Sequence, residues 1–283
     1  MKYLLSILLA LITSAGYVHF FAPQSGSAAA PSETAYERVL RTGVLRCGYA
    51  IATPWMMVDP ATNALSGVSY DMTRAVADKL GLKVEWVEET GWGVAEQGIM
   101  AGRYDMLCGN VCVDPKRTQA AWYSRPFVHI PLFAIARSDD TRFDQNLAAA
   151  NSPDIHIGVK NGHVFEFTTN ENFPKAHKVY LNDISDDTEF LLMLKGKKID
   201  IAYTGQSTLD LYTKANGNVA KTVGPAVRFC NGGFMMPRGD VELKHSVDAA
   251  IAELNAAGTI QRILNAYMPA DVKYARVPAH DYQ

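Results

Sequence analysis

The sequence of 283 residues lacks the short motifs that mark several large classes of enzyme. It contains no glycine-rich phosphate loop, no G-x-S-x-G nucleophile turn and no H-E-x-x-H zinc motif. The seven histidines are scattered, and no two of them stand at the spacing of metal ligands. We therefore expect no metal site, no cofactor and no catalytic group of these classes.

The sequence also has no large net charge of either sign. Lysine and arginine together number 27 and aspartate and glutamate 29, so the formal net charge is −2. This balance excludes the strongly basic surface that is typical of nucleic-acid-binding proteins. The hydrophobic share of 48% is too high for a disordered chain and is enough for a large core. Composition therefore indicates a globular protein.

Cysteine is scarce, with four residues in the chain. Four are too few for a disulfide scaffold, and the spacing of Cys108 and Cys112 is not that of a common zinc site. We expect all four thiols to be buried and free. One disulfide is the alternative, and the sequence does not select its partners among Cys47, Cys108, Cys112 and Cys230.

The longest apolar run lies at the start of the sequence. Lys2 precedes an uncharged, largely apolar stretch over residues 3–21, and small residues follow up to residue 30. This order is typical of a secretory signal. The run is also long enough for an uncleaved membrane anchor, which is the alternative. We expect residues 1–30 to direct export to the periplasm, with membrane anchoring if the signal is not cleaved.

The rest of the chain alternates between helix and strand patterns. Expected helices begin near Thr34, Ser69, Val94, Asp114, His163, Asp186 and Ser207, and two more lie in the tail. Expected strands cover residues 44–50, 82–86, 105–113, 154–159 and 199–203. This alternation implies an α/β fold with mostly parallel sheets. Because both halves show it, we expect two lobes.

Several motifs follow one another in an order that resembles family 3 solute-binding proteins, the periplasmic receptors of amino-acid ABC transporters. The first half contains Thr53-Pro-Trp55, Gly67-Val-Ser-Tyr-Asp71, Lys79-Leu-Gly81, Trp92, Gly102-Arg-Tyr-Asp105, Asp114-Pro-Lys-Arg117 and Tyr123-Ser-Arg-Pro-Phe127. The second half contains Gly158-Val-Lys-Asn-Gly162, Gly196-Lys-Lys-Ile-Asp200, Met236-Pro-Arg-Gly-Asp240 and Ala257-Gly-Thr-Ile260. Each motif is weak alone, but together they span residues 35–270.

The resemblance implies a two-lobed periplasmic binding protein (type II, Venus-flytrap) with two hinge crossings. Lobe 1 is expected at residues 31–128 plus 233–283, and lobe 2 at 129–232. Closure of the lobes around a solute is a known switching mode. The implied partners are a small carboxylate-bearing solute and an ABC permease in the membrane, and the protein is expected to be a monomer.

Arg117 is the strongest candidate for binding a carboxylate. It falls in the first turn of the helix expected after Asp114, where free N–H groups and the helix dipole favour an anion. A guanidinium there can hold a carboxylate through two parallel hydrogen bonds. The family places its carboxylate-binding arginine at this position. The alternative is a surface arginine that pairs with a nearby acid.

The resemblance supplies the other candidate site residues. Trp92 matches an aromatic residue that covers the ligand, and Trp55 matches one near the mouth of the cleft; core packing is the alternative for both. The remaining candidates are small residues or residues expected to face the cleft in either lobe. They are Gly109, Asn110, Cys112, Lys160, Gly162, His163, Val164, Thr204 and Gly205.

One position departs from the family pattern. Gly205 stands where amino-acid receptors usually have the aspartate that binds the α-ammonium group, and an ammonium buried without a counter-charge is costly. Either another acid substitutes, or the ligand has no α-amino group. Lys160 and His163 add potential positive charge, which shifts the expectation toward a small carboxylate or a doubly anionic solute. For His163 the alternative is an exposed turn residue.

Two rival functions remain. The fold also occurs in the enzyme cyclohexadienyl dehydratase. If this protein were such an enzyme, Glu166 would be the candidate acid in the cleft. A general acid there would need a pKa raised by burial. Since that glutamate also matches one common in plain receptors, we expect no enzyme activity. The other rival is a sensory or accessory binding module held by an uncleaved N-terminal helix.

Overall fold

The computed structural model describes residues 33–115, 117–268 and 275–279. The expected signal peptide or anchor at residues 1–30 lies outside them. Contacts divide the chain into two units after Thr34, and the second unit begins at Ala35. Among the described helices, none has both the length and the apolar character needed to cross a membrane.

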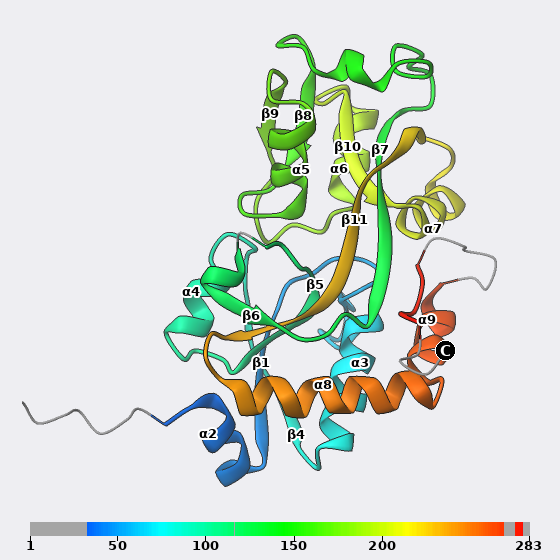
Figure 1. The fold of residues 1–283 in the computed structure, drawn as a ribbon. Helices are drawn as coiled ribbons and strands as arrows, with labels where there is room; N and C mark the ends of the chain where they lie inside the picture. The colour runs from blue at the N-terminus through cyan, green and yellow to red at the C-terminus, as the bar shows by residue number, and fades with distance from the viewer. Residues whose placement is uncertain (1–32, 116, 269–274, 280–283) are drawn as a thin grey trace, which may run out of the picture. The chain divides into compact units, whose positions relative to one another are not determined.

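Nine strands of this unit form one sheet in the order β4-β1-β5-β11-β7-β10-β8-β9, with β6 paired to β11 (Figure 1). The bounds are β1 Val44–Tyr49, β4 Lys83–Glu89, β5 Met106–Cys112, β6 Ala121–Tyr123, β7 Val128–Arg137, β8 His156–Val159, β9 His177–Tyr180, β10 Ile201–Gly205 and β11 Ala220–Pro237. A separate hairpin joins β2 Met57–Val58 to β3 Leu65–Ser66.

The helices divide into two groups by the strands and helices they contact. Near β1, β4 and β5 lie α2 Ala35–Thr42, α3 Val68–Lys79, α4 Ala95–Met100, α8 Val241–Ala256 and α9 Thr259–Tyr267. Near β8 and β10 lie α5 Val164–Asn172, α6 Glu189–Lys195 and α7 Gln206–Asn216. We call these groups, with their strands, the first and the second lobe. Two short 3₁₀ turns, η1 Arg117–Gln119 and η2 Leu147–Ala150, complete the set.

Most of the expected elements are present, with corrections to strand direction and to three helix starts: the helix expected near Asp186 is α6, which begins at Glu189. Strands β4, β1 and β5 are mutually parallel, as are β10, β8 and β9. The two parallel sets are joined by β7 and β11, which run antiparallel to each other. The helix expected at Asp114 is only the three-residue turn η1, and α3 begins at Val68 after Gly67, not at Ser69.

Gly67 shows why α3 starts there. Its φ of 117° lies in the region that favours glycine, and an added Cβ would sit 2.6 Å from the carbonyl oxygen of Trp55. The Trp55 oxygen accepts the backbone N–H of Ser69 at 2.7 Å. The segment after β1 therefore sits directly on the beginning of α3.

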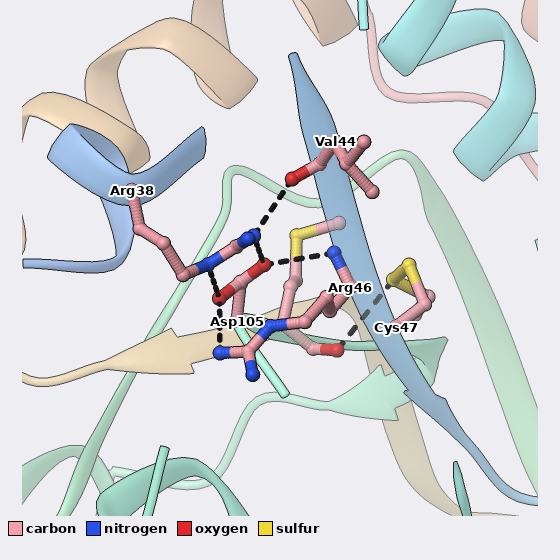
Figure 2. Close-up of a disulfide and its surroundings, with 7 residues drawn as sticks. Arg38, Val44, Arg46, Cys47 and Asp105 are labelled. Atoms are coloured by element: carbon pink, nitrogen blue, oxygen red, sulfur yellow. Dashed lines mark hydrogen bonds and ion pairs between the residues drawn. A yellow bond between two sulfur atoms is a disulfide. The ribbon is translucent and has the colours of Figure 1, made fainter. Parts of the chain in front are cut away.

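A buried carboxylate, Asp105, ties the first lobe together (Figure 2). It is 1% exposed and forms ion pairs with the guanidinium groups of Arg38 and Arg46. It also accepts the backbone N–H of Arg46 at 2.8 Å, and Arg38 donates onward to the carbonyl of Val44 at 2.7 Å. The aspartate of the Gly102-Arg-Tyr-Asp105 motif therefore joins α2, β1 and the start of β5.

Replacing Asp105 by asparagine should destabilise the fold, because two arginines would lose their carboxylate. Both arginines are partly solvated, so we expect the free energy of unfolding to fall by about 2–3 kcal/mol. This is less than the usual cost of breaking a fully buried ion pair. Urea denaturation measures this loss. The control Asp139→Asn removes an exposed partner of Arg137 and should cost less than about 1 kcal/mol. Equal losses in the two variants would contradict this role of Asp105.

The expectation of four free thiols is wrong, because the cysteines form two disulfides. Cys47 in β1 is bonded to Cys108 in the neighbouring strand β5, with a Cα–Cα distance of 5.5 Å. Cys112 at the end of β5 is bonded to Cys230 in β11 at 4.9 Å. The bonds span 61 and 118 residues, so each should stabilise the fold by about 2–4 kcal/mol. Doubling a loop adds only about 0.6 kcal/mol, so the two contributions should be similar.

Candidate functional site

A cavity lies between the two lobes; we call it the main cavity. It is bordered by the segment after β1, the ends of β5 and β10, the starts of α3 and α5, and the middle of β7 and β11. Its volume is about 60 Å³, enough for a few waters or a small solute. Eight predicted site residues line it: Trp55, Trp92, Asn110, Cys112, His163, Val164, Thr204 and Gly205.

A second cavity adjoins the first; we call it the side cavity. It shares five lining residues with the main cavity: Trp92, Asn110, Cys112, His163 and Val164. Its far end adds Asp114, Arg117, Phe167 and Arg228. Arg117, the strongest candidate from the sequence, therefore lines the side cavity and not the main cavity.

The three remaining candidates line neither cavity. Lys160 is fully buried, and Gly109 lies behind Trp92, where an added Cβ would be 3.9 Å from the indole. Gly162 has a φ of 65°, and an added Cβ would be 2.7 Å from the Cα of Gly93. This close approach, across the two lobes, is possible only with glycine at position 162.

Trp92 and His163 face each other across the cleft. Their ring centroids are 5.0 Å apart, and the side chain of His163 also packs against Phe165. His163 caps α5, since its Nδ1 accepts the N–H of Phe165 at 3.4 Å. Burial lowers the pKa of His163 to about 4, so its ring is neutral at pH 7. The expectation that it adds positive charge is wrong, and so is the alternative of an exposed turn residue.

Lys160 does not supply free positive charge either. Its ammonium group lies 2.7 Å from the carboxylate of Asp187 and donates to the carbonyl of Ser185. Asp187, in contrast, lines the main cavity. Sequence reasoning missed this acid because Asp186, its neighbour, was the expected start of the helix. The only signal was a polar stretch before α6 in the second lobe.

The arginines of the side cavity are paired as well. Arg117 forms an ion pair with Glu96 and donates to the carbonyl of Gly162 in the second lobe at 3.0 Å. Arg228 pairs with Asp114 at 3.1 Å and with Glu171 at 2.8 Å. Within the described residues, every cation that lines or flanks the two cavities thus has a carboxylate partner. A ligand anion would therefore compete with these carboxylates for the cations.

Direct hydrogen bonds hold the lobes together at the other end of the main cavity. The N–H and the hydroxyl of Thr53 donate to Asp186 at 3.0 and 2.7 Å, and Thr208 donates to the carbonyl of Thr53 at 3.3 Å. Burial alone would raise the pKa of Asp186, but hydrogen bonds from Thr188 and Thr53 hold it below its usual value. The structure is therefore a closed form of the cleft.

Apart from Asp187 Oδ1, whose neighbour is the ammonium group of Lys160, three side-chain atoms of the residues that line the main cavity lack a hydrogen-bond partner among the described residues. They are the hydroxyl oxygen of Ser69, the indole Nε1 of Trp92 and the amide oxygen of Asn110. Buried polar atoms are nearly always hydrogen-bonded in folded proteins. Two of these three atoms are hydrogen-bond acceptors and one is a donor, so their hydrogen-bonding capacity is unused within the described residues. Over the described part of the chain, no cluster of histidine, cysteine and acidic residues could hold a metal.

The neutral His163 should make stability depend on pH. Its folded pKa of about 4 lies below its unfolded value of 6.5, so the unfolded chain binds the proton first as the pH falls. Stability is unaffected above about pH 6.5 and should fall by about 2 kcal/mol by about pH 5. His163→Asn, which keeps an oxygen to cap α5, removes this titration.

The test is urea denaturation of both proteins at pH 7 and pH 5. The wild type should lose about 2 kcal/mol more than His163→Asn between the two pH values. The same loss in both proteins would mean that His163 is not held neutral.

Residues 45–270 match the bacterial extracellular solute-binding proteins, family 3. The L-cystine-binding protein TcyJ of Escherichia coli K12 is 22% identical over 235 residues, covering 83% of this chain and 86% of that protein. The cyclohexadienyl dehydratase of Pseudomonas aeruginosa is 23% identical over 235 residues, covering 81% and 84%. A solved Streptococcus pneumoniae amino acid ABC transporter substrate-binding protein, bound to L-arginine, superposes with a TM-score of 0.71 at 21% identity, covering 83% and 97%.

Proposed function

Because the chain belongs to the bacterial extracellular solute-binding proteins of family 3, we propose that it captures an amino acid or a similar small solute bearing both an amine and a carboxylate. The solute would be enclosed between the lobes and passed to an ABC permease. The observation that carries this proposal is Asp187, a carboxylate at the main cavity whose nearest cation is buried behind it.

In this proposal Asp187 takes the role of the aspartate that is missing at position 205. Asp187 and Gly205 both line the main cavity, so an acid from the segment before α6 can take the place of the missing one. The oxygens of Asn110 and Ser69 add two acceptors for an ammonium group. A solute cation would thus meet a counter-charge and hydrogen-bond acceptors, which offset the cost of its burial. We therefore favour a substituting acid over a ligand without an amine.

The side cavity suits the carboxylate end of the same solute. Arg117 and Arg228 both line it, and it shares Trp92 with the main cavity as a lining residue. Glu96 occupies Arg117 in the closed form, so an incoming carboxylate would replace or share that partner. The indole of Trp92 would cover the chain between the two ends of the solute. TcyJ is named for L-cystine, and the S. pneumoniae protein was solved with L-arginine; both are amine-bearing amino acids.

The proposal also covers the partner, the location and the lobe boundaries of the protein. We propose a periplasmic monomer that serves an ABC permease, with lobe 1 at residues 31–128 plus 233–283 and lobe 2 at 129–232. We also propose that it is not a dehydratase. Glu166 is absent from the lining of both cavities, and its carboxylate accepts the N–H of Gly162 at 2.9 Å and the hydroxyl of Tyr180 at 2.6 Å. These bonds support a structural role.

Isothermal titration with paired solutes tests the proposal. The panel contains L-arginine, L-cystine, L-glutamine and L-glutamate, and the amine-free glutarate, 2-oxoglutarate and prephenate. We expect an amine-bearing solute to bind most tightly. Asp187→Asn and Arg117→Ala each remove a charge-assisted contact, so each should weaken the binding of that solute by about 10- to 100-fold. Tightest binding of an amine-free dianion, or turnover of prephenate, would contradict the proposal.

Two further variants separate recognition of charge from a loss of stability. Asp154→Asn removes an exposed acid of the second lobe and should leave affinity unchanged. Lys160→Met frees Asp187 from its internal partner, so it should lower stability while tightening amine binding. A purely structural pair would instead lower the affinity for every solute in both Lys160→Met and Asp187→Asn.

A further inference from the structure

The crossing between the lobes contains a short two-stranded segment without a third strand. Strand β10 pairs with residues 132–136 of β7, and β5 pairs with β11 at Gly232, Gly233 and Met235. Between these regions, residues 130–131 of β7 and 229–230 of β11 pair, among the described strands, only with each other. We call these four residues the hinge ribbon. Because no third strand braces it, the ribbon is a part of the crossing that can bend.

The Cys112–Cys230 disulfide joins this ribbon to the first lobe. Cys112 is the last residue of β5, and Cys230 lies in the ribbon opposite Ile130. The bond therefore holds one strand of the ribbon at the end of β5, close to where β11 begins to pair with that strand. Bending of the ribbon away from β5 is limited as long as the bond is intact.

The same bond forms part of the wall of the ligand site. Cys112, Cys230 and Ile130 all line the main cavity, and Cys112 also lines the side cavity. Asn110 packs directly on β11, since a Cβ added to Gly232 would lie 1.7 Å from its amide oxygen. That oxygen is one of the acceptors without a partner. The position of β11 against β5 thus sets where a solute acceptor points.

We propose that the Cys112–Cys230 disulfide is a positioning bond of the receptor: it fixes the hinge ribbon on β5 and so preforms the cavity for its solute. The other disulfide serves as a contrast. Cys47 and Cys108 are both fully buried inside the first lobe and are absent from the lining of both cavities. Both bonds stabilise the fold, but only Cys112–Cys230 sets solute affinity.

Matched double variants test this difference. Cys112→Ala/Cys230→Ala and Cys47→Ala/Cys108→Ala each remove one bond, and urea denaturation should show comparable losses of stability. Hydrogen exchange is then followed, without any solute, in peptides covering residues 107–113 and 226–233. We expect exchange at least about tenfold faster than wild type around the ribbon in the first variant only, because a tenfold change reports a tenfold larger open population.

Solute affinity is the second readout, measured with the tightest solute of the panel at a temperature where both variants are folded. It should fall at least about tenfold in Cys112→Ala/Cys230→Ala and stay near wild type in Cys47→Ala/Cys108→Ala, since a smaller competent population weakens apparent binding in proportion. Equal exchange in the two variants, or unchanged affinity in the first, would overturn the proposal. This readout rests on the proposed function; the exchange measurement does not, so it decides even if no solute of the panel binds.

Discussion

The pairing of β7 with β11 is the constraint on which the rest of the structure depends. These two strands carry backbone hydrogen bonds from the parallel strands of one lobe to those of the other (Figure 1). Because β5 joins β11 and β10 joins β7, the ends of β5 and β10 come to the same place. The main cavity lies there, and the residues that line it come from segments more than 150 positions apart. The position of the main cavity thus follows from the way β7 and β11 join the two sets of parallel strands.

Charge inside this site is arranged in pairs. Lys160 with Asp187, Arg117 with Glu96, and Arg228 with Asp114 and Glu171 leave no described cation of the cleft without a carboxylate. An ion buried here without a partner would be costly. The proposed solute carries one charge of each sign, so its amine would lie near Asp187 and its carboxylate would replace or share a partner of the arginines.

The sequence predicts most helices and the five strands β1, β4, β5, β8 and β10, because the periods of helix and strand patterns are local properties. It does not predict β7 and β11, the two strands that join the lobes. It also predicts eight of the residues that line the main cavity, through motifs whose order is characteristic of the family. It does not predict Asp187 or the two disulfides, because these depend on which distant segments lie side by side. The charge of His163 is equally out of reach, since burial by Trp92 and Phe165 lowers its pKa.

A crystal structure with the tightest-binding solute tests the central claim most directly. The account predicts the solute amine about 3 Å from the carboxylate of Asp187 and its carboxylate against the guanidinium of Arg117. Trp92 should cover the atoms between them. A solute bound with its carboxylate toward Asp187 and Lys160, or one that leaves Asp187 untouched, would contradict the account.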